Sequence, residues 1–240
     1  MKREDLCPLI KSMASFDFIT EALIASGIGK GGEMDAYLEK LEDLKLKFMP
    51  GLMTVNDPVG RARRLFEWLW REKPNRYESR GKYRLNEVVD AQLSVDDRSV
   101  GNCLGLTLLY NCLLRKMGIP ARALFLPFAF NEGPHVLTLL PAEGREIEIE
   151  NILPDGFDYR GYFDSPGREA WGDRELVADI YLSRGNEFFA QREWLQSLEN
   201  YEKAIWFNPS YEKAHLNKAI LLDRLGREEG AEGILGKEKR

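Results

Sequence analysis

The sequence lacks several features that would place it in a common class of protein. Its 240 residues contain no run of about 18 apolar residues, the length that a membrane-spanning helix needs, so we expect no membrane association. Positive charge is not in excess, because 34 Lys and Arg stand against 39 Asp and Glu, and the net charge of −5 disfavours nucleic-acid binding. The glycine patterns of P-loops and dinucleotide-binding turns are also missing, and we expect no cofactor.

Cysteine and histidine are scarce. The three cysteines, Cys7, Cys103 and Cys112, form an odd and sparse set that is unlike a disulfide scaffold, so we expect free thiols in a reducing, cytoplasmic setting. The first residues are basic and then at once acidic, without the apolar stretch of a signal peptide, which agrees with that location. Without a Cys-x-x-Cys or His-Glu-x-x-His pattern, the chain gives no support for a metal site.

What the sequence does contain is a clear helical pattern in its first half. Apolar residues at helical spacing, separated by Gly and Pro, predict helices over residues 18–24, 37–48, 59–71 and 85–93. Asp57, just before Pro58, has the position of a helix cap. From Cys103 to Met117 the chain is apolar almost all round, which predicts a helix buried on most sides, and Gly118 is the expected left-handed C-cap.

Strands follow this buried helix. Residues 121–130, 135–140 and 145–152 alternate as strands do, and residues 141–144 have the composition of a turn between the last two. The predicted fold class is therefore α+β, with a buried helix packed on a small antiparallel sheet. We expect a helical N-terminal region over residues 1–58, a core over residues 59–170 and a helical segment over residues 171–240.

A repeat signal lies in the last segment. With Ala178 as the first position, the residue types match those of a repeat of about 34 residues at Gly185, Phe188, Tyr201, Ala204 and Pro209. The stretch from Asn200 to Pro209 resembles the tetratricopeptide (TPR) family, although Ser197 replaces the usual Ala. A second unit from Glu212 would place Ala219, Leu222 and Ala231 in register. About one and a half repeats are fewer than the roughly three needed for stability, so they should pack on the core or on a protein partner.

Cys103 has the position of a reactive thiol. It opens the buried helix directly after a turn signal, and a helix N-terminus stabilises a thiolate through its unpaired N–H groups and its dipole. Cys112 lies deep in the same helix and is expected to be a small core residue, whereas Cys7 has no visible partner. Of the two histidines, His215 belongs to the repeat segment and is given no catalytic role.

His135 is then the candidate base for Cys103. If residues 141–144 form a four-residue hairpin loop, His135 lies directly opposite Glu150, within reach of a hydrogen bond. Glu148 shares that face and is the second candidate partner, and a slip of one residue would make Asn151 the third. In the plainer interpretation, the acidic residues of this strand are only a solvated face.

The stretch from Gly101 to Arg122 resembles the core of the transglutaminase-like superfamily. Here Cys103 opens a helix that ends in Arg115-Lys116-Met117-Gly118-Ile119-Pro120-Ala121-Arg122. The resemblance covers roughly residues 59–158, and residues 83–89 are similar to the region ahead of the Cys in bacterial members with TPR tails. In that family a His and then an Asp, less often another polar residue, follow on successive strands, where this chain has His135 and Glu150. Val136 replaces the aromatic residue that often follows the family His.

The resemblance implies a papain/transglutaminase-like core with a Cys103-His135-Glu150 catalytic triad. Such a protein would act as a cysteine hydrolase (peptidase or amidase) or as an acyltransferase on a peptide or protein substrate. The N–H of Cys103 would be one oxyanion donor, and Asn102 or Gln92 the second. The alternative is a scaffold that has kept the fold without the chemistry and binds a partner peptide through its TPR helices.

Overall fold

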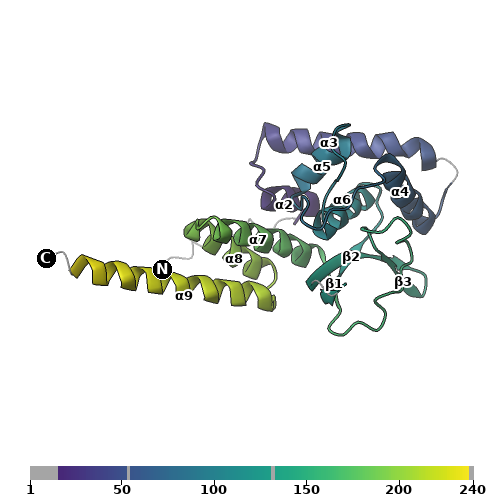
Figure 1. Cartoon of the computed structure of the whole chain (residues 1–240). Helices are drawn as coiled ribbons and strands as arrows, with labels where there is room; N and C mark the ends of the chain where they lie inside the picture. Colours follow the sequence, from purple (N-terminus) through teal and green to yellow (C-terminus); the bar gives the residue numbers. More distant parts are fainter. Residues whose placement is uncertain (1–15, 53–54, 131–132, 238–240) are drawn as a thin grey trace, which may run out of the picture.

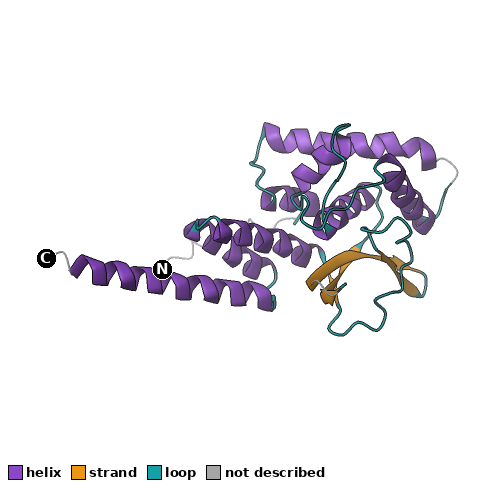
Figure 2. Ribbon diagram, viewed as in Figure 1, coloured by secondary structure: helices purple, strands orange, loops and turns teal. Residues whose placement is uncertain are grey.

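The computed structural model describes residues 16–52, 55–130 and 133–237, with side chains up to residue 226, and has an α+β architecture. The first elements are α2 (Phe18–Ala25), α3 (Gly32–Phe48), the 3-10 helix η1 (Met49–Leu52), α4 (Pro58–Glu72), α5 (Leu85–Leu93) and α6 (Cys103–Lys116). The strands are β1 (Arg122–Ala129), β2 (Gly133–Ala142), β3 (Arg145–Ile149) and β4 (Glu169–Trp171). The last helices are α7 (Asp173–Ala190), α8 (Trp194–Phe207) and α9 (Glu212–Lys237). In Figures 1 and 2 the first helices lie over one side of the sheet, and α9 points away from it.

The predicted helices are present, and local sequence accounts for their ends. The Asp57 carboxylate accepts a hydrogen bond of 2.6 Å from the Gly60 N–H and so caps α4. Gly118, with φ of 72°, takes the left-handed conformation after α6. The helix α3 begins at Gly32, earlier than predicted, with Glu33 and Asp35 in its first turn, where negative charge suits the helix dipole.

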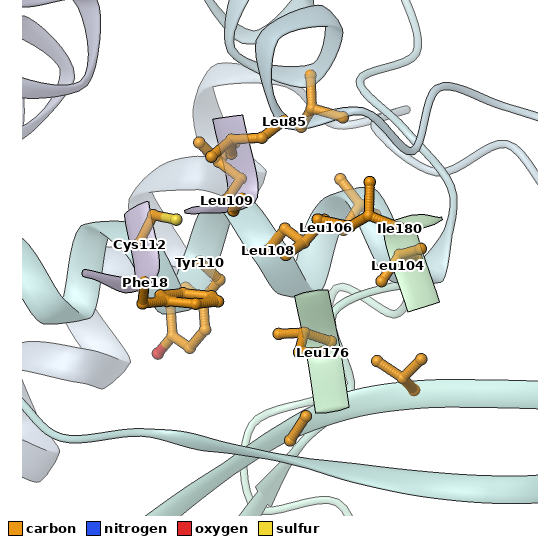
Figure 3. Packing of buried hydrophobic residues seen from close by; sticks show 14 of the residues in the cluster. Phe18, Leu85, Leu104, Leu106, Leu108, Leu109, Tyr110, Cys112, Leu176 and Ile180 are labelled. Atoms are coloured by element: carbon orange, nitrogen blue, oxygen red, sulfur yellow. The ribbon is translucent and has the colours of Figure 1, made fainter. Parts of the chain in front are cut away.

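The helix α6 is the centre of the core. Its side chains from Leu104 to Leu114 are all buried, and they meet residues of α2, α5 and α7 (Figure 3). Cys112 is fully buried in this packing, and burial raises the pKa of its thiol, so the prediction of a core cysteine is confirmed. A helix that is apolar on all sides thus has neighbours on all sides.

A buried hydrogen-bond network joins α6 to the sheet. The Thr138 hydroxyl donates to the Asn111 side-chain oxygen at 2.7 Å, and the Asn151 amide donates to Thr138 at 2.9 Å and to Thr107 at 3.2 Å. The Thr107 hydroxyl donates to the Val136 carbonyl at 3.2 Å. Because an unpaired buried polar group is costly, this network permits few other positions of α6 on the sheet.

The sheet is antiparallel and has the order β3-β2-β1-β4. The predicted register between β2 and β3 was wrong by two residues. Pro141 pairs with Glu146 and Ala142 with Arg145, so the turn consists only of Glu143 and Gly144, and Gly144 has a φ of 71°. A shift of two residues keeps every side chain on its predicted face. Consequently His135 and Glu150 still share a face, although they are not directly opposite.

The two faces of the sheet are covered differently. On one face the apolar residues join the core around α6: Val136, Leu140, Ile147 and Ile149. On the other face a smaller apolar cluster is closed by Tyr162: Leu124, Leu126, Ala129, Leu137 and Leu139. Tyr162 belongs to the long connection over residues 150–168, and the strand β4 that ends this connection was not predicted. The face that carries His135 and Glu150 is therefore covered by irregular chain.

The C-terminal helices begin inside the core. Buried residues of α7 (Leu176, Val177, Ala178 and Ile180) pack in the same cluster as α2 and α6. Arg115 of α6 forms an ion pair of 2.7 Å with Asp173, and the Arg184 guanidinium donates to the Ala25 carbonyl at 2.8 Å. The core is thus continuous across residues 58 and 170, where we expect boundaries between regions.

Candidate functional site

Cys103 is held at the start of α6 by a tightly fitted turn. The Asn102 side chain caps the helix by accepting a hydrogen bond of 3.1 Å from the Gly105 N–H, and the Asn102 N–H donates to the Lys82 carbonyl at 2.9 Å. A Cβ atom at Gly101 or at Gly105 would lie 2.6 or 2.5 Å from that carbonyl oxygen. Only glycine fits at these two places, which fixes the helix start that carries Cys103.

His135 and Glu150 form a buried pair. The His135 Nε2 lies 2.7 Å from the Glu150 Oε2, with the residues 5% and 0% exposed. The backbone N–H of Ile152 donates to the other carboxylate oxygen of Glu150 at 3.3 Å. Gly156 closes the turn behind Glu150, because a Cβ there would lie 2.0 Å from the Glu150 carbonyl oxygen. Glu150 is therefore a fixed acceptor for the imidazole.

The same imidazole lies close enough to Cys103 for the thiol to affect its pKa. Burial lowers the pKa of His135, but hydrogen bonds to Cys103 and Glu150 and the charges of both groups raise it, with a net pKa of about 9. Cys103 itself is only partly buried, unlike its two partners. The predicted residues Cys103, His135 and Glu150 thus lie together, with His135 bonded to Glu150 and influenced by Cys103.

Aromatic side chains surround the imidazole. The Phe130 ring meets His135 edge-on with 5.4 Å between ring centroids, and the Tyr162 ring lies 5.8 Å away. Phe130 has a φ of 53°, an uncommon conformation for a residue with a side chain. These rings exclude water from the His135–Glu150 pair, which strengthens the hydrogen bond between them.

No family model, curated protein or solved structure matches the chain. What the site does is therefore inferred from its residues and their geometry.

The other candidate partners of His135 are engaged elsewhere. Glu148 accepts a hydrogen bond of 2.5 Å from Arg168, and Asn151 belongs to the network with Thr107 and Thr138. Glu148 and Glu150 are both buried, so the alternative in which they form a solvated face is wrong. His215 is exposed and lies 2.8 Å from the Pro209 carbonyl oxygen.

The structure also shows where the two residues predicted as a second oxyanion donor lie, Asn102 and Gln92. The side-chain oxygen of Asn102 is occupied as the helix cap. Gln92 lines a surface hollow together with Trp68 and Lys73, among residues of α3, α4 and α5. The amide nitrogen of Asn102 is not used by this cap, so Asn102 and Gln92 stay the predicted candidates for the second donor.

Sequence reasoning missed the aromatic cover of the site. Phe130 was predicted to end a strand but lies in the turn after β1, with a φ of 53°. Tyr162 lies outside any periodic pattern, and Arg168, which holds its segment, is separated from Glu148 by an irregular stretch. The one available signal was the density of aromatic residues in residues 157–163, which is unusual for a solvent-exposed loop.

Within the described residues, no group of three or more His, Cys, Asp or Glu side chains is arranged to hold a metal ion. Among the described helices, none has both the length and the apolar character required to span a bilayer.

Proposed function

We propose that this protein is a cysteine hydrolase or acyltransferase with a papain/transglutaminase-like core that acts through Cys103, His135 and Glu150. The observation that carries the proposal is the position of the His135 imidazole, which bonds to the buried Glu150 carboxylate at 2.7 Å and lies close enough to Cys103 for the thiol to raise its pKa. A nucleophile, a base and a group that orients the base are the parts that covalent acyl transfer needs. The resemblance of residues 101–122 to the transglutaminase-like superfamily supports the same chemistry.

The first step would be addition of the Cys103 sulfur to an amide or ester carbonyl. His135 takes the thiol proton and then returns it to the leaving amine or alcohol, and an acyl thioester on Cys103 remains. Glu150 keeps the imidazole in one orientation and stabilises its protonated form. Its role needs no change of charge, which suits a carboxylate with no exposure to solvent.

The acyl group can then pass to water or to an amine. Transfer to water would make the protein a peptidase or amidase, and transfer to an amine would make it a transglutaminase. Peptides and proteins are the proposed substrate class. A reducing, cytoplasmic setting remains the expected location because it keeps Cys103 as a free thiol.

Alkylation of the cysteines with iodoacetamide at pH 7 tests this proposal. We expect Cys103 to react faster than Cys7, and we expect His135→Ala to slow the reaction of Cys103. The matched control is His215→Ala, which removes the other histidine of the chain and should leave the rate unchanged. Equal rates at Cys7 and Cys103, or equal rates in the two histidine variants, would contradict the proposal.

A second candidate function is a scaffold that binds a protein partner through TPR-like helices. It is favoured by large apolar side chains exposed on α8 and α9: Leu195, Trp206, Leu216 and Ile220, which are 49–77% exposed. The close contact of Gly185 with the Tyr201 ring fits a tightly packed pair of antiparallel helices. Exposed apolar patches commonly mark interaction surfaces.

Paired variants separate the two functions. Leu216→Glu with Ile220→Glu should abolish partner binding if the helices are the functional surface, and Cys103→Ala should then bind normally. If instead Cys103→Ala traps or loses a partner while the α9 variant does not, the partner is a substrate of the thiol site.

A further inference from the structure

The Phe130 residue combines an exposed side chain with a strained backbone. It is 47% exposed, and its φ of 53° lies in the left-handed region that a residue with a bulky side chain seldom adopts. Glycine or asparagine would take this conformation at lower cost, and a polar side chain would suit the exposed position better. The stability of the fold therefore does not account for a phenylalanine here. Residues strained in this way cluster at functional sites.

The Phe130 ring lies directly against the proposed base. Its centroid is 5.4 Å from that of the His135 imidazole, and the two rings are nearly perpendicular, at 84°. The Phe130 ring also meets the Tyr162 ring edge-on, with 5.5 Å between centroids. Because about half of the residue stays exposed beyond these two contacts, Phe130 offers an apolar surface to solvent beside the imidazole.

The start of α6 lies at the same place. The short connection from α6 to β1 makes the two run antiparallel, and β2 is also antiparallel to β1, so α6 and β2 point the same way. The Thr107 hydroxyl donates to the Val136 carbonyl at 3.2 Å. Cys103 lies about one helical turn before Thr107, and His135 lies directly before Val136. The thiol and the imidazole are therefore at one end of the contact between α6 and β2, the end that Phe130 borders.

The leaving group of the proposed reaction has to reach this imidazole. A leaving amine takes its proton from His135, which requires hydrogen-bonding distance. An amine that accepts the acyl group from Cys103 enters by the same position, because its attack is the reverse of that departure. Its nitrogen bonds to the carbonyl carbon, the C–S bond breaks, and His135 takes the amine proton and gives it to the sulfur. The group carried by that nitrogen is thus brought to the surroundings of the imidazole.

We propose that Phe130 forms a subsite for an apolar group on the leaving or acceptor amine. An aliphatic or aromatic group in that position covers the exposed ring and is itself removed from water, whereas water and small amines gain nothing from the ring. The subsite rests on the proposed acyl chemistry of Cys103. It adds that the amines released or accepted there carry an apolar chain.

Competition between two amines for one acyl group tests the proposal. Cys103 is acylated with p-nitrophenyl acetate in the presence of ethylamine and hexylamine, which have nearly equal basicity and differ in chain length, and the two acetamides are measured by mass spectrometry. One buried CH2 group contributes about fourfold in binding, so we expect the wild type to favour hexylamine at least about tenfold over a thioester in free solution. Phe130→Ala should lower this preference to within about twofold of free solution, whereas Phe130→Leu should retain most of it.

The control variant is Phe163→Ala, which removes a phenylalanine that is 74% exposed and whose ring contacts Arg168. It should keep the preference for hexylamine. The subsite would be overturned if the wild type had no such preference or captured neither amine, if Phe130→Ala kept the preference, or if Phe163→Ala lost it equally. In each of these cases release of p-nitrophenolate at Cys103 would leave the acyl chemistry standing. If wild-type Cys103 is not acylated at all, the proposed function itself fails, and the subsite fails with it.

Discussion

Glu148 in β3 and Glu150 directly after its end have different partners. They are two residues apart and both are buried, yet Glu150 faces His135 whereas Glu148 holds Arg168. An imidazole paired with a buried carboxylate keeps its proton more strongly than one that is alone. The two positions therefore form a matched pair for mutation.

We predict that Glu150→Gln slows alkylation of Cys103 at pH 7 about tenfold, the change in equilibrium that one pKa unit of the imidazole represents. The variant keeps the shape of the side chain but removes the charge that raises the pKa of His135. Glu148→Gln should leave the alkylation rate within about twofold, because Glu148 does not touch the imidazole. Equal effects of the two variants would mean that Glu150 only supports the fold.

At the scale of secondary structure, the contact between α7 and α8 depends on a glycine. A Cβ atom at Gly185 would lie 2.5 Å from two carbons of the Tyr201 ring, and Tyr201 is 2% exposed, so its ring has no space to move. Overpacking of this kind costs about 1–3 kcal/mol, which exceeds the gain of up to about 1 kcal/mol from the better helix propensity of Ala.

We therefore predict that Gly185→Ala lowers the free energy of unfolding by about 1–2 kcal/mol, measured by urea denaturation. Gly226→Ala on α9 is the control, because a Cβ there meets nothing within 4 Å. That change should be neutral or should stabilise the protein by up to about 1 kcal/mol. A stabilising effect of both substitutions would show that α7 and α8 do not pack as described.

The helices could be predicted closely from the sequence, but the hairpin could not. Helical periodicity, the Asp57 cap and Gly118 are local signals, and local signals decide where α4 and α6 begin and end. In the hairpin, the sequence predicts Pro141 to be a turn residue, but Pro141 pairs with Glu146 inside the sheet. Turn chemistry alone did not reveal the two-residue turn. The faces were nevertheless predicted correctly because they depend only on the alternation of residues.

The sequence predicted the three central residues of the candidate site but not the residues that cover them. Cys103, His135 and Glu150 were identified from the helix start, the strand faces and the resemblance to a family. Tyr162 and its anchor Arg168 were not, because an irregular segment has no period from which its packing can be derived.

At the scale of the whole molecule, α7 completes the core around α6. Its residues that are at most 1% exposed there include Leu176, Val177, Ala178 and Ile180. Each of the larger three stabilises the fold by about 1.5–3 kcal/mol on burial, and a domain is stable by only about 5–15 kcal/mol in total. The core should therefore not fold without α7.

We predict that a chain ending at Trp171 loses cooperative unfolding, whereas a chain ending at Pro209 keeps it. The measurement is urea denaturation followed by tryptophan fluorescence. If the chain ending at Trp171 unfolded cooperatively with nearly full stability, the region over residues 171–240 would be an independent unit.

Protonation of His135 also affects the whole molecule. Its pKa is about 9 in the folded protein against 6.5 for a free imidazole, so protons bind the folded state more tightly. The resulting stability is fully present below about pH 6.5 and is lost as the pH rises through about 9, with a total of up to about 3 kcal/mol. We predict that the free energy of unfolding falls over this range in the wild type and is flatter in His135→Gln. A steeper fall in the variant would contradict the assignment.

The central claim is that one imidazole is shared by the Cys103 thiol and the Glu150 carboxylate. A titration of the His135 ring followed by NMR measures this most directly, with His215 as an internal reference in a chain that has two histidines. We predict a midpoint of about 9 for His135 in the wild type, and a lower midpoint in Cys103→Ala and in Glu150→Gln. A wild-type midpoint near 6.5, or one that neither substitution changes, would contradict the account.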